Sequence, residues 1–136
     1  GVSFVDDSKG TNLDSTARAL EGFADRSVHL ILGGRDKGGD YAEIGDVVVR
    51  KARRLYLIGE AAEKIEARLA SRLGGYVDIE RCGTLERAVE AALAAVRAGD
   101  TVLLSPACSS FDQFRDFNHR GDEFQRLVHQ ALAGKG

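Results

Sequence analysis

Cysteine, methionine and proline are scarce in this sequence. Its 136 residues contain no methionine, one proline (Pro106) and two cysteines (Cys82 and Cys108). Two cysteines in a chain of this length do not make a disulfide framework, and neither has another cysteine or a histidine at metal-ligand spacing. We therefore expect no metal-binding site in this chain, and we expect it to work in a reducing compartment, the cytoplasm.

An excess of charge of one sign and long apolar runs are also missing. The 19 basic and 21 acidic side chains are scattered along the chain and leave a net charge of -2, so no basic stripe predicts a nucleic-acid partner. The apolar stretches are too short to span a bilayer and no signal-peptide pattern opens the sequence, so we expect no membrane association. With 43% apolar and 29% charged residues, the composition is that of a soluble globular protein.

The length is typical of one compact domain with a hydrophobic core. The sequence begins inside an apolar run, Gly1 to Val5, which indicates a strand already under way. Together with the missing methionine, this beginning leads us to expect one domain of a longer polypeptide.

Short β-rich segments alternate with segments of helical periodicity. The predicted strands cover 2–5, 28–32, 55–58, 76–79 and 101–104. Several of them are continuously apolar, as in strands buried on both faces. Apolar stripes at helical spacing predict helices around Leu13 to Ala24, Ala61 to Leu73, Leu85 to Val96 and Phe124 to Leu132. The segment 41–53 favours a helix, although Val47 to Val49 would also suit a strand.

A strand followed by a helix, repeated about five times, predicts parallel pairing with right-handed crossovers. We therefore predict one α/β domain, a Rossmann-like, doubly wound, mostly parallel sheet of about five or six strands with helices on both faces. Ligands of such sheets bind beyond the carboxyl ends of the strands. The strand-to-helix loops after Ile58 and Ile79 are short and chemically plain, whereas the other three are not.

The first loop, residues 6–12, has the sequence DDSKGTN and leads into the predicted helix at Leu13. Asn12 is a suitable N-cap for that helix. Thr11 would then lie at the positive end of the helix, where carboxylates and phosphates bind. A polar, well-capped turn is the alternative, but it accounts less well for the two acidic residues and the lysine of this loop.

The second loop, residues 33–40, has the sequence GGRDKGGD. Its four glycines let the backbone come close to a ligand, and Arg35 and Lys37 supply cationic donors. The glycines match neither the Walker A order nor the G-x-G-x-x-G dinucleotide fingerprint. For this segment alone, a surface loop with solvated charges is an alternative of equal weight.

The last loop, residues 105–117, contains the hydroxyl residues Ser109 and Ser110 ahead of aromatic residues at helical spacing. We interpret Phe114 as core packing and Cys108 as a small buried thiol rather than a nucleophile.

The histidines give little support for catalysis. His119 would be the candidate base for Cys108, but no third group at a recognisable spacing would orient it. His29 lies within a predicted strand and His129 on the last predicted helix, so both are interpreted as structural or solvent-facing. The three loops thus predict an anion-binding face without a general base, nucleophile or metal ligands of its own.

Taken in order, the three loops resemble the Mur ligase family. The matching segments are DSKGTN (7–12), LGGRDKG (32–38) and SPACSSFDQFRDFNHRGDEF (105–124), and the resemblance covers the whole chain in motif order and spacing. The last segment is the most specific, and it is similar to the family members that join glutamate to UDP-N-acetylmuramoyl-L-alanine. The first segment alone would indicate only a Mur ligase in general.

The resemblance implies a bacterial, cytoplasmic enzyme of peptidoglycan synthesis that uses ATP and Mg²⁺. In the family, ATP phosphorylates the terminal carboxylate of UDP-N-acetylmuramoyl-L-alanine, and the glutamate amine attacks the acyl phosphate. This chain would be the C-terminal, amino-acid-binding domain, without the UDP-sugar and central ATPase domains. We therefore expect a monomer with no catalytic residue in this chain alone, no tightly bound cofactor and no activity of the isolated chain.

The resemblance also implies site residues. Thr11 and Lys37 would hold one carboxylate of glutamate, and Ser110, with the backbone around Phe111 and Phe117, would hold the other. This division suits a dianionic amino acid, which needs donors at both ends.

The nucleotide would face Asp7 and Lys9, with Asp7 accepting hydrogen bonds from ribose hydroxyls. Arg35 departs from the family pattern, which often has an aspartate there, and its role stays open. The alternatives are a related Mur-type ligase for another amino acid, or a non-catalytic nucleotide- or anion-binding module. The D-N-P-R motif of the diamino-acid enzymes does not occur in the sequence.

Overall fold

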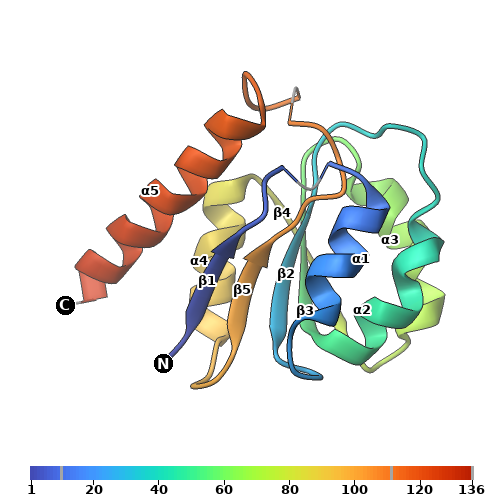
Figure 1. Cartoon of the computed structure of the whole chain (residues 1–136), viewed down its shortest axis with the longest axis horizontal. Helices are drawn as coiled ribbons and strands as arrows, with labels where there is room; N and C mark the ends of the chain where they lie inside the picture. Colours follow the sequence, from blue (N-terminus) through green and yellow to red (C-terminus); the bar gives the residue numbers. More distant parts are fainter. Residues whose placement is uncertain (10, 111, 136) are drawn as a thin grey trace.

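Five parallel strands form one sheet in the order β1-β5-β2-β3-β4. The computed structural model describes residues 1–9, 11–110 and 112–135, in which the strands are β1 (Ser3–Asp6), β2 (Val28–Gly33), β3 (Ala52–Ile58), β4 (Asp78–Gly83) and β5 (Thr101–Leu104). The helices are α1 (Leu13–Glu21), the 3-10 helix η1 (Tyr41–Ile44), α2 (Gly45–Lys51), α3 (Ala62–Leu73), α4 (Leu85–Ala95) and α5 (Phe117–Lys135). This arrangement confirms the predicted Rossmann-like α/β fold (Figure 1).

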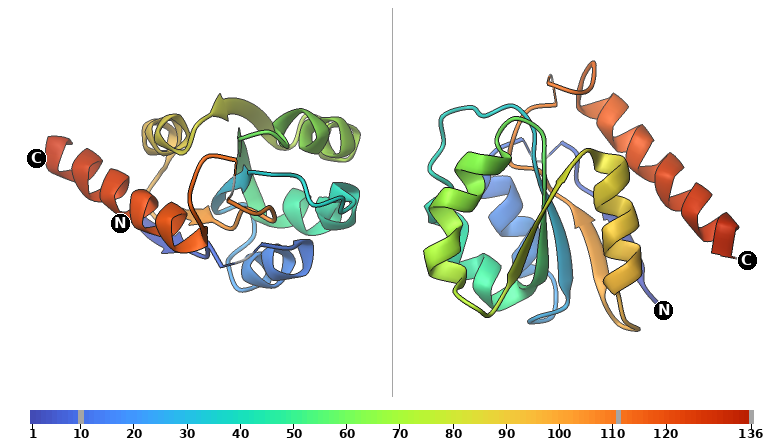
Figure 2. Two further views of the ribbon diagram at one scale, coloured as in Figure 1. Left: turned by 90° about the horizontal axis from the view of Figure 1, so that it is seen from above. Right: turned by 180° about the vertical axis from the view of Figure 1, so that it is seen from behind.

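The two faces of the sheet are covered by different helices. Leu30 and Leu32 of β2 belong to a core shared with α1, α2 and α3, whereas Ile31 between them belongs to a core shared with α4 and α5. Figure 2 shows these two groups of helices on opposite sides of the strands. Because side chains alternate along a strand, each central strand contributes to both cores, which explains its largely apolar sequence.

The segment 41–53 is helical for most of its length. It begins as η1, continues as α2 and becomes strand β3 at Ala52. The helix prediction is therefore confirmed up to Lys51, and the strand alternative for Val47 to Val49 is wrong. Val47 and Val48 are buried in the core beside the sheet, so packing overrides the β propensity of the three valines.

The predicted strand 76–79 is wrong at both ends, because β4 runs from Asp78 to Gly83. Tyr76 is 72% exposed and precedes the strand. As an edge strand, β4 is held partly by charge: Asp78 and Glu80 lie 3.7 and 3.1 Å from Arg54 on β3. Cross-strand ion pairs of this kind leave no apolar pattern in the sequence.

The three loops predicted to carry the chemistry meet at one edge of the sheet. The chain reverses its direction across the sheet after β4, so β5 enters between β1 and β2. The first, last and second loops therefore follow three adjacent strands, and they lie together at the top of Figure 1. Ligands of doubly wound sheets bind at such a reversal point.

His29 of β2 is fully buried and has a polar partner at both ring nitrogens. Its Nδ1 lies 2.8 Å from the Tyr56 hydroxyl, and its Nε2 lies 2.9 Å from the Asp100 carboxylate. Burial lowers the pKa of His29, although Asp100 opposes part of this effect. The neutral ring then donates from Nε2 to Asp100 and accepts from Tyr56 at Nδ1. His29 is therefore structural, one of the two alternatives, structural or solvent-facing, predicted for it from the sequence.

We expect the stability of the chain to fall as the pH drops below about 6.5, the pKa of an unfolded histidine. Below this pH the unfolded chain binds a proton that folded His29, with its lowered pKa, does not bind. The free energy of unfolding should therefore decrease toward low pH, by at most about 1.4 kcal/mol per pH unit for this group. In a His29→Gln variant, which keeps an N–H donor, the decrease should be smaller. Urea denaturation between pH 5 and 7 measures it, and parallel profiles would contradict the expectation.

Candidate functional site

Asn12 caps helix α1 as predicted. Its side-chain oxygen accepts a hydrogen bond from the Ser15 backbone N–H at 2.9 Å. Asp7, at the end of β1, accepts a hydrogen bond from the Ser105 hydroxyl at 2.8 Å, and the Thr16 hydroxyl donates to the Ser105 carbonyl at 3.0 Å. These contacts join the first loop, the last loop and α1.

Two glycines let the second loop pass close to its neighbours. Gly33 and Gly34 have φ angles of +133° and +136°, and a Cβ atom at Gly34 would lie 2.3 Å from the Ser109 carbonyl oxygen. The Arg35 backbone N–H donates to that same carbonyl at 3.0 Å. The Arg35 side chain is exposed, with Nε 3.9 Å from Glu60 in the loop after β3. Gly34 thus allows the second loop to approach the last loop, and Gly33 allows it to approach the backbone of Ile58 in β3.

Thr11 and Lys37 lie together on a cavity of about 300 Å³. The Lys37 ammonium donates to the Thr11 carbonyl at 3.1 Å, so it reaches from the second loop to the first. The N-terminal turn of α1 and Tyr41 also line this first cavity. A hydroxyl, an ammonium and a helix N-terminus all favour an anion. The cavity is also lined by two acidic residues, Asp14 and Glu43, which would repel an anion. The part of the cavity beside Lys37 therefore suits an anion best.

Asp7 and Lys9 line a second cavity, of about 290 Å³, together with Phe117. Carboxylates and an amide supply acceptors here, and the remaining lining residues are Asp6, Ser8, Asn118, Gly121 and Asp122. Acceptors beside one lysine suit a ligand with both hydroxyl and anionic groups. Phe117, predicted to face glutamate, therefore lies with the residues predicted to face the nucleotide.

Ser110, one of the predicted glutamate contacts, does not line either cavity. Ser110 is 2% exposed and is not among the lining residues of the first or second cavity, and its carbonyl accepts the N–H groups of Gln113 and Phe114. Phe111 lies outside the described residues. The structure thus brings Thr11 together with Lys37, and it leaves the contact of Ser110 with a ligand as a prediction.

Arg120 joins the first and last loops, a role that was not predicted from the sequence. It is fully buried on α5; its Nε and Nη2 donate to the Ser8 hydroxyl and carbonyl at 2.9 and 2.8 Å, and its Nη1 donates to the Cys108 carbonyl at 3.0 Å. The Ser8 hydroxyl in turn donates to the Phe117 carbonyl at 2.8 Å. Burial lowers the pKa of Arg120 to about 10, so the guanidinium stays charged at neutral pH.

The signal for this contact was the arginine-glycine pair in the last motif. A Cβ atom at Gly121 would lie 2.6 Å from the Asp6 carboxylate oxygen, so glycine lets α5 approach the end of β1. Arg120 can then reach the first loop. The pair is visible in the sequence, but its partners become neighbours only in the fold.

The plain loops after β3 and β4 also help to hold the last loop. The Asp112 carboxylate accepts the Glu60 backbone N–H at 3.0 Å, and the Gln113 side-chain amide donates to the Gly83 carbonyl at 2.9 Å. These partners are backbone groups, which carry no signal in the sequence. The two loops are chemically plain, as predicted, yet they position the neighbouring residues of Ser110.

Cys108 is confirmed as a buried thiol. It is fully buried, and burial raises its pKa, which is the opposite of what activates a cysteine nucleophile. His119 is engaged elsewhere, because its Nδ1 accepts the Arg115 N–H at 3.1 Å and its ring packs edge-on against Phe114.

Metal ligands are not grouped in the part of the chain that the structure describes: no three His, Cys, Asp or Glu side chains there could hold a metal ion together. One acidic residue near the first cavity, Asp36, is paired with Lys64 at 2.8 Å instead. Among the same residues, no helix is long and apolar enough to cross a membrane.

The fold and the site together define a class of protein, a Rossmann-like α/β domain whose loops present hydroxyl and cationic side chains at the carboxyl ends of its strands. Residues 1–108 match the family model described as Mur ligase, glutamate ligase domain. The match covers well over half of the chain, and the chain belongs to this family.

Curated relatives share nearly the whole chain. The UDP-N-acetylmuramoylalanine--D-glutamate ligase of Desulfatibacillum aliphaticivorans is 51% identical over 97% of this chain and 28% of its own length. The proteins of the same name from Geotalea daltonii and Syntrophotalea carbinolica are each 48% identical, over 98% and 100% of this chain. The chain spans 28% and 29% of the length of these two relatives.

Replacing Arg120 with lysine should destabilise the fold by roughly 2–4 kcal/mol, because one ammonium cannot reproduce three charge-assisted hydrogen bonds in the guanidinium geometry. Arg126→Lys is the matched control. Arg126 lies on the same helix, is exposed and pairs with Glu123, so its replacement should change stability by less than about 1 kcal/mol. Urea denaturation compares the two, and equal effects would show that the Arg120 contacts do not hold the loops.

Proposed function

We propose that this chain is the amino-acid-binding domain of an ATP-dependent ligase that adds D-glutamate to UDP-N-acetylmuramoyl-L-alanine. The observation that carries the proposal is the convergence of Thr11 and Lys37 on one cavity beside the N-terminus of α1. The names of the relatives support glutamate, and the D-isomer in particular. Hydrogen-bond donors to the two carboxylates would not by themselves distinguish D-glutamate from L-glutamate.

Lys37 and Thr11 would bind one carboxylate of glutamate from the second and first loops. Ser110, with the backbone around Phe111 and Phe117, would bind the other from the last loop. Because the Ser110 side chain is buried, this second contact requires the last loop to shift beyond Cys108, whose carbonyl Arg120 holds, when the ligand binds. The two carboxylates would then be held by different loops, which lets the site measure the length of the amino acid.

ATP would lie against the second cavity, with Asp7 accepting hydrogen bonds from ribose hydroxyls and Lys9 near the phosphates. The fit rests on the Asp7 carboxylate, which the Ser105 hydroxyl holds at the end of β1. In the described part of this chain, no three His, Cys, Asp or Glu side chains are grouped so that they could hold Mg²⁺. We therefore assign the metal ions to other parts of the protein.

The reaction would pass through an acyl phosphate on the UDP-linked substrate, which the glutamate amine attacks with release of phosphate. The contribution of this chain is to hold the amine in position, an effect worth several kcal/mol of the barrier when two reactants are oriented. No residue of this chain is proposed as catalytic. The UDP-sugar and central ATPase domains would form the rest of a monomeric, cytoplasmic enzyme of peptidoglycan synthesis.

In the full-length protein, Lys37→Ala should raise the KM for D-glutamate by roughly tenfold or more, because a charge-assisted hydrogen bond contributes about 1.5–3 kcal/mol. The KM for ATP should change by less than about twofold. Steady-state kinetics with each substrate varied in turn measures both constants. An unchanged KM for glutamate would make Lys37 a solvated charge of the loop.

The isolated chain should neither hydrolyse ATP nor ligate glutamate, because none of its loops matches a P-loop. Phosphate release and product formation in the presence of ATP, Mg²⁺, D-glutamate and UDP-N-acetylmuramoyl-L-alanine test this. Turnover well above the background of a heat-denatured sample would contradict the assignment of catalysis to other domains.

A further inference from the structure

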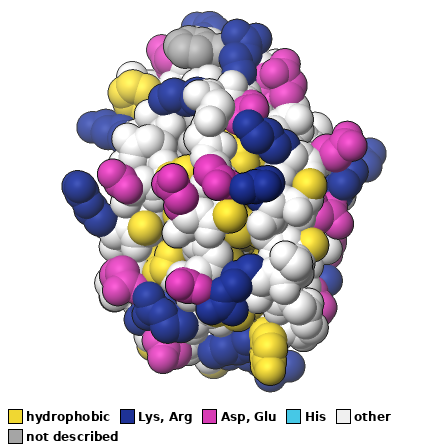
Figure 3. Space-filling model, turned by 90° about the vertical axis from the view of Figure 1, so that its right-hand side faces the viewer, with side chains coloured by type: hydrophobic (Ala, Val, Ile, Leu, Met, Phe, Trp, Pro, Cys, Tyr) yellow, Lys and Arg dark blue, Asp and Glu magenta, His cyan; other side chains and the backbone are white. Residues whose placement is uncertain are grey.

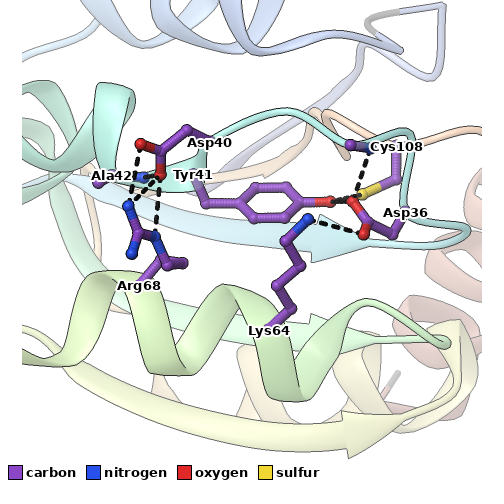
Figure 4. Close-up of polar contacts among 8 residues, drawn as sticks. Asp36, Asp40, Tyr41, Ala42, Lys64, Arg68 and Cys108 are labelled. Carbon is purple, nitrogen blue, oxygen red and sulfur yellow. Dashed lines mark hydrogen bonds and ion pairs between the residues drawn. The ribbon is translucent and has the colours of Figure 1, made fainter.

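Two aspartates flank Lys37 in the second loop, and helix α3 holds both. Asp36 accepts the Lys64 ammonium at 2.8 Å, and Asp40 accepts the Nε and Nη2 of Arg68, each at 3.0 Å. Lys64 and Arg68 are one helical turn apart and face the loop from the same side of α3 (Figure 4). The segment that carries Lys37 is therefore tied to one helix at both ends.

Asp36 also closes a turn around Lys37. Its Oδ1 accepts the Gly38 backbone N–H at 3.0 Å and the Tyr41 hydroxyl at 2.9 Å. An aspartate that bonds the backbone two residues later fixes the residue between them. The hydrogen bonds from Lys64 and from the Gly38 N–H lower the pKa of Asp36 to about 2, so the carboxylate is ionised at any pH at which the protein would be assayed.

Tyr41 connects this turn to the last loop. It is 2% exposed, and its hydroxyl lies between Asp36 and the Cys108 sulfur, which is 3.2 Å away. An ionised carboxylate has no proton, so the tyrosine donates to Asp36 and the thiol of Cys108 donates to the tyrosine. Arg120 holds the Cys108 carbonyl. These bonds anchor the turn that carries Lys37 to the buried part of the site. Tyr41 also lines the first cavity beside Lys37.

We propose that Lys64, Asp36 and Tyr41 are positioning residues for Lys37. They hold the loop so that the Lys37 ammonium faces the first cavity, and they thereby set the affinity for the carboxylate of the incoming glutamate. The inference rests on the proposed function, in which Lys37 binds that carboxylate. Since Lys64 and Asp36 act through Lys37, their loss should change the KM for glutamate and not the KM for ATP.

A third ion pair on α3 provides a control. Arg72 lies two turns after Lys64 and contacts Asp46 of α2 at 2.6 Å, outside the second loop. Basic and acidic side chains lie next to one another across the face formed by α2 and α3 (Figure 3). Lys64 and Arg72 thus lie on the same helix, are both exposed and each pair with an aspartate. They differ in that only the partner of Lys64 adjoins Lys37.

In the full-length protein, Lys64→Met should raise the KM for D-glutamate roughly fivefold, with kcat and the KM for ATP changed by less than about twofold. Methionine keeps an unbranched aliphatic side chain and removes the ammonium, and with it the bond to Asp36 and the contact with the Tyr41 ring, whose centroid lies 5.7 Å from Nζ. Lys64→Arg should restore the wild-type KM, and Arg72→Met should leave it unchanged. Equal effects of Lys64→Met and Arg72→Met would overturn the inference, because both would then reflect general weakening of α3.

A double variant separates this inference from the proposed function. The effect of Lys64→Met should disappear when Lys37 is already alanine, because a positioning residue has nothing left to position. An effect that persists in the Lys37→Ala background would overturn the inference. If Lys37→Ala itself leaves the KM for glutamate unchanged, both the Lys37 contact and the inference fail. If Lys37→Ala raises it and Lys64→Met does not, only the inference fails.

Tyr41→Phe provides a second, independent variant. It keeps the buried ring and removes the hydroxyl that bonds Asp36, so it should raise the KM for glutamate in the same direction as Lys64→Met. A thermal melt of each variant shows whether it is folded. A folded Tyr41→Phe protein with an unchanged KM for glutamate would remove the tyrosine from the proposed set.

Discussion

The Arg120 guanidinium lies out of contact with water and donates to Ser8 in the first loop and to Cys108 in the last. A charge in such a place is costly unless its donors are satisfied. Any movement of either loop away from α5 would leave buried donors without acceptors. The first loop, the last loop and the start of α5 are therefore coupled. The second cavity lies on this coupled unit, and the first cavity lies between it and the second loop.

The second loop is held by weaker means. Its aspartates pair with exposed lysine and arginine side chains of α3, and each such pair contributes little on its own. Its firm contacts are the two glycines packed against neighbouring backbone and the buried Tyr41. The Lys37 ammonium thus stands on a loop that is anchored to buried residues near its ends and held by exposed ion pairs between them. Partial preorganisation of this kind would reduce the ordering cost of binding the proposed ligand, glutamate, which is flexible and doubly charged.

Most of the fold could be predicted because the central strands are buried on both faces. The largely apolar runs at 28–32 and 101–104 mark strands that the structure confirms within one residue. The prediction failed where burial did not decide the structure. The edge strand β4, whose predicted bounds are wrong at both ends, is held in part by ion pairs to Arg54. The helix predicted for 41–53 is confirmed up to Lys51, because its buried valines pack beside the sheet.

By itself the sequence determined that glycines, hydroxyl residues and charges gather in the loops after three strands, which is why these loops were predicted to form the site. It also determined that Asn12 caps α1 and that Cys108 is a buried thiol. Only the tertiary structure decided that Thr11 and Lys37 share a cavity and that Phe117 lies instead with Asp7 and Lys9. The insertion of β5 between β1 and β2 makes these loops neighbours. Long-range contacts of this kind, including those of Arg120 with backbone carbonyls, depend on strand order, and no local spacing along the chain encodes them.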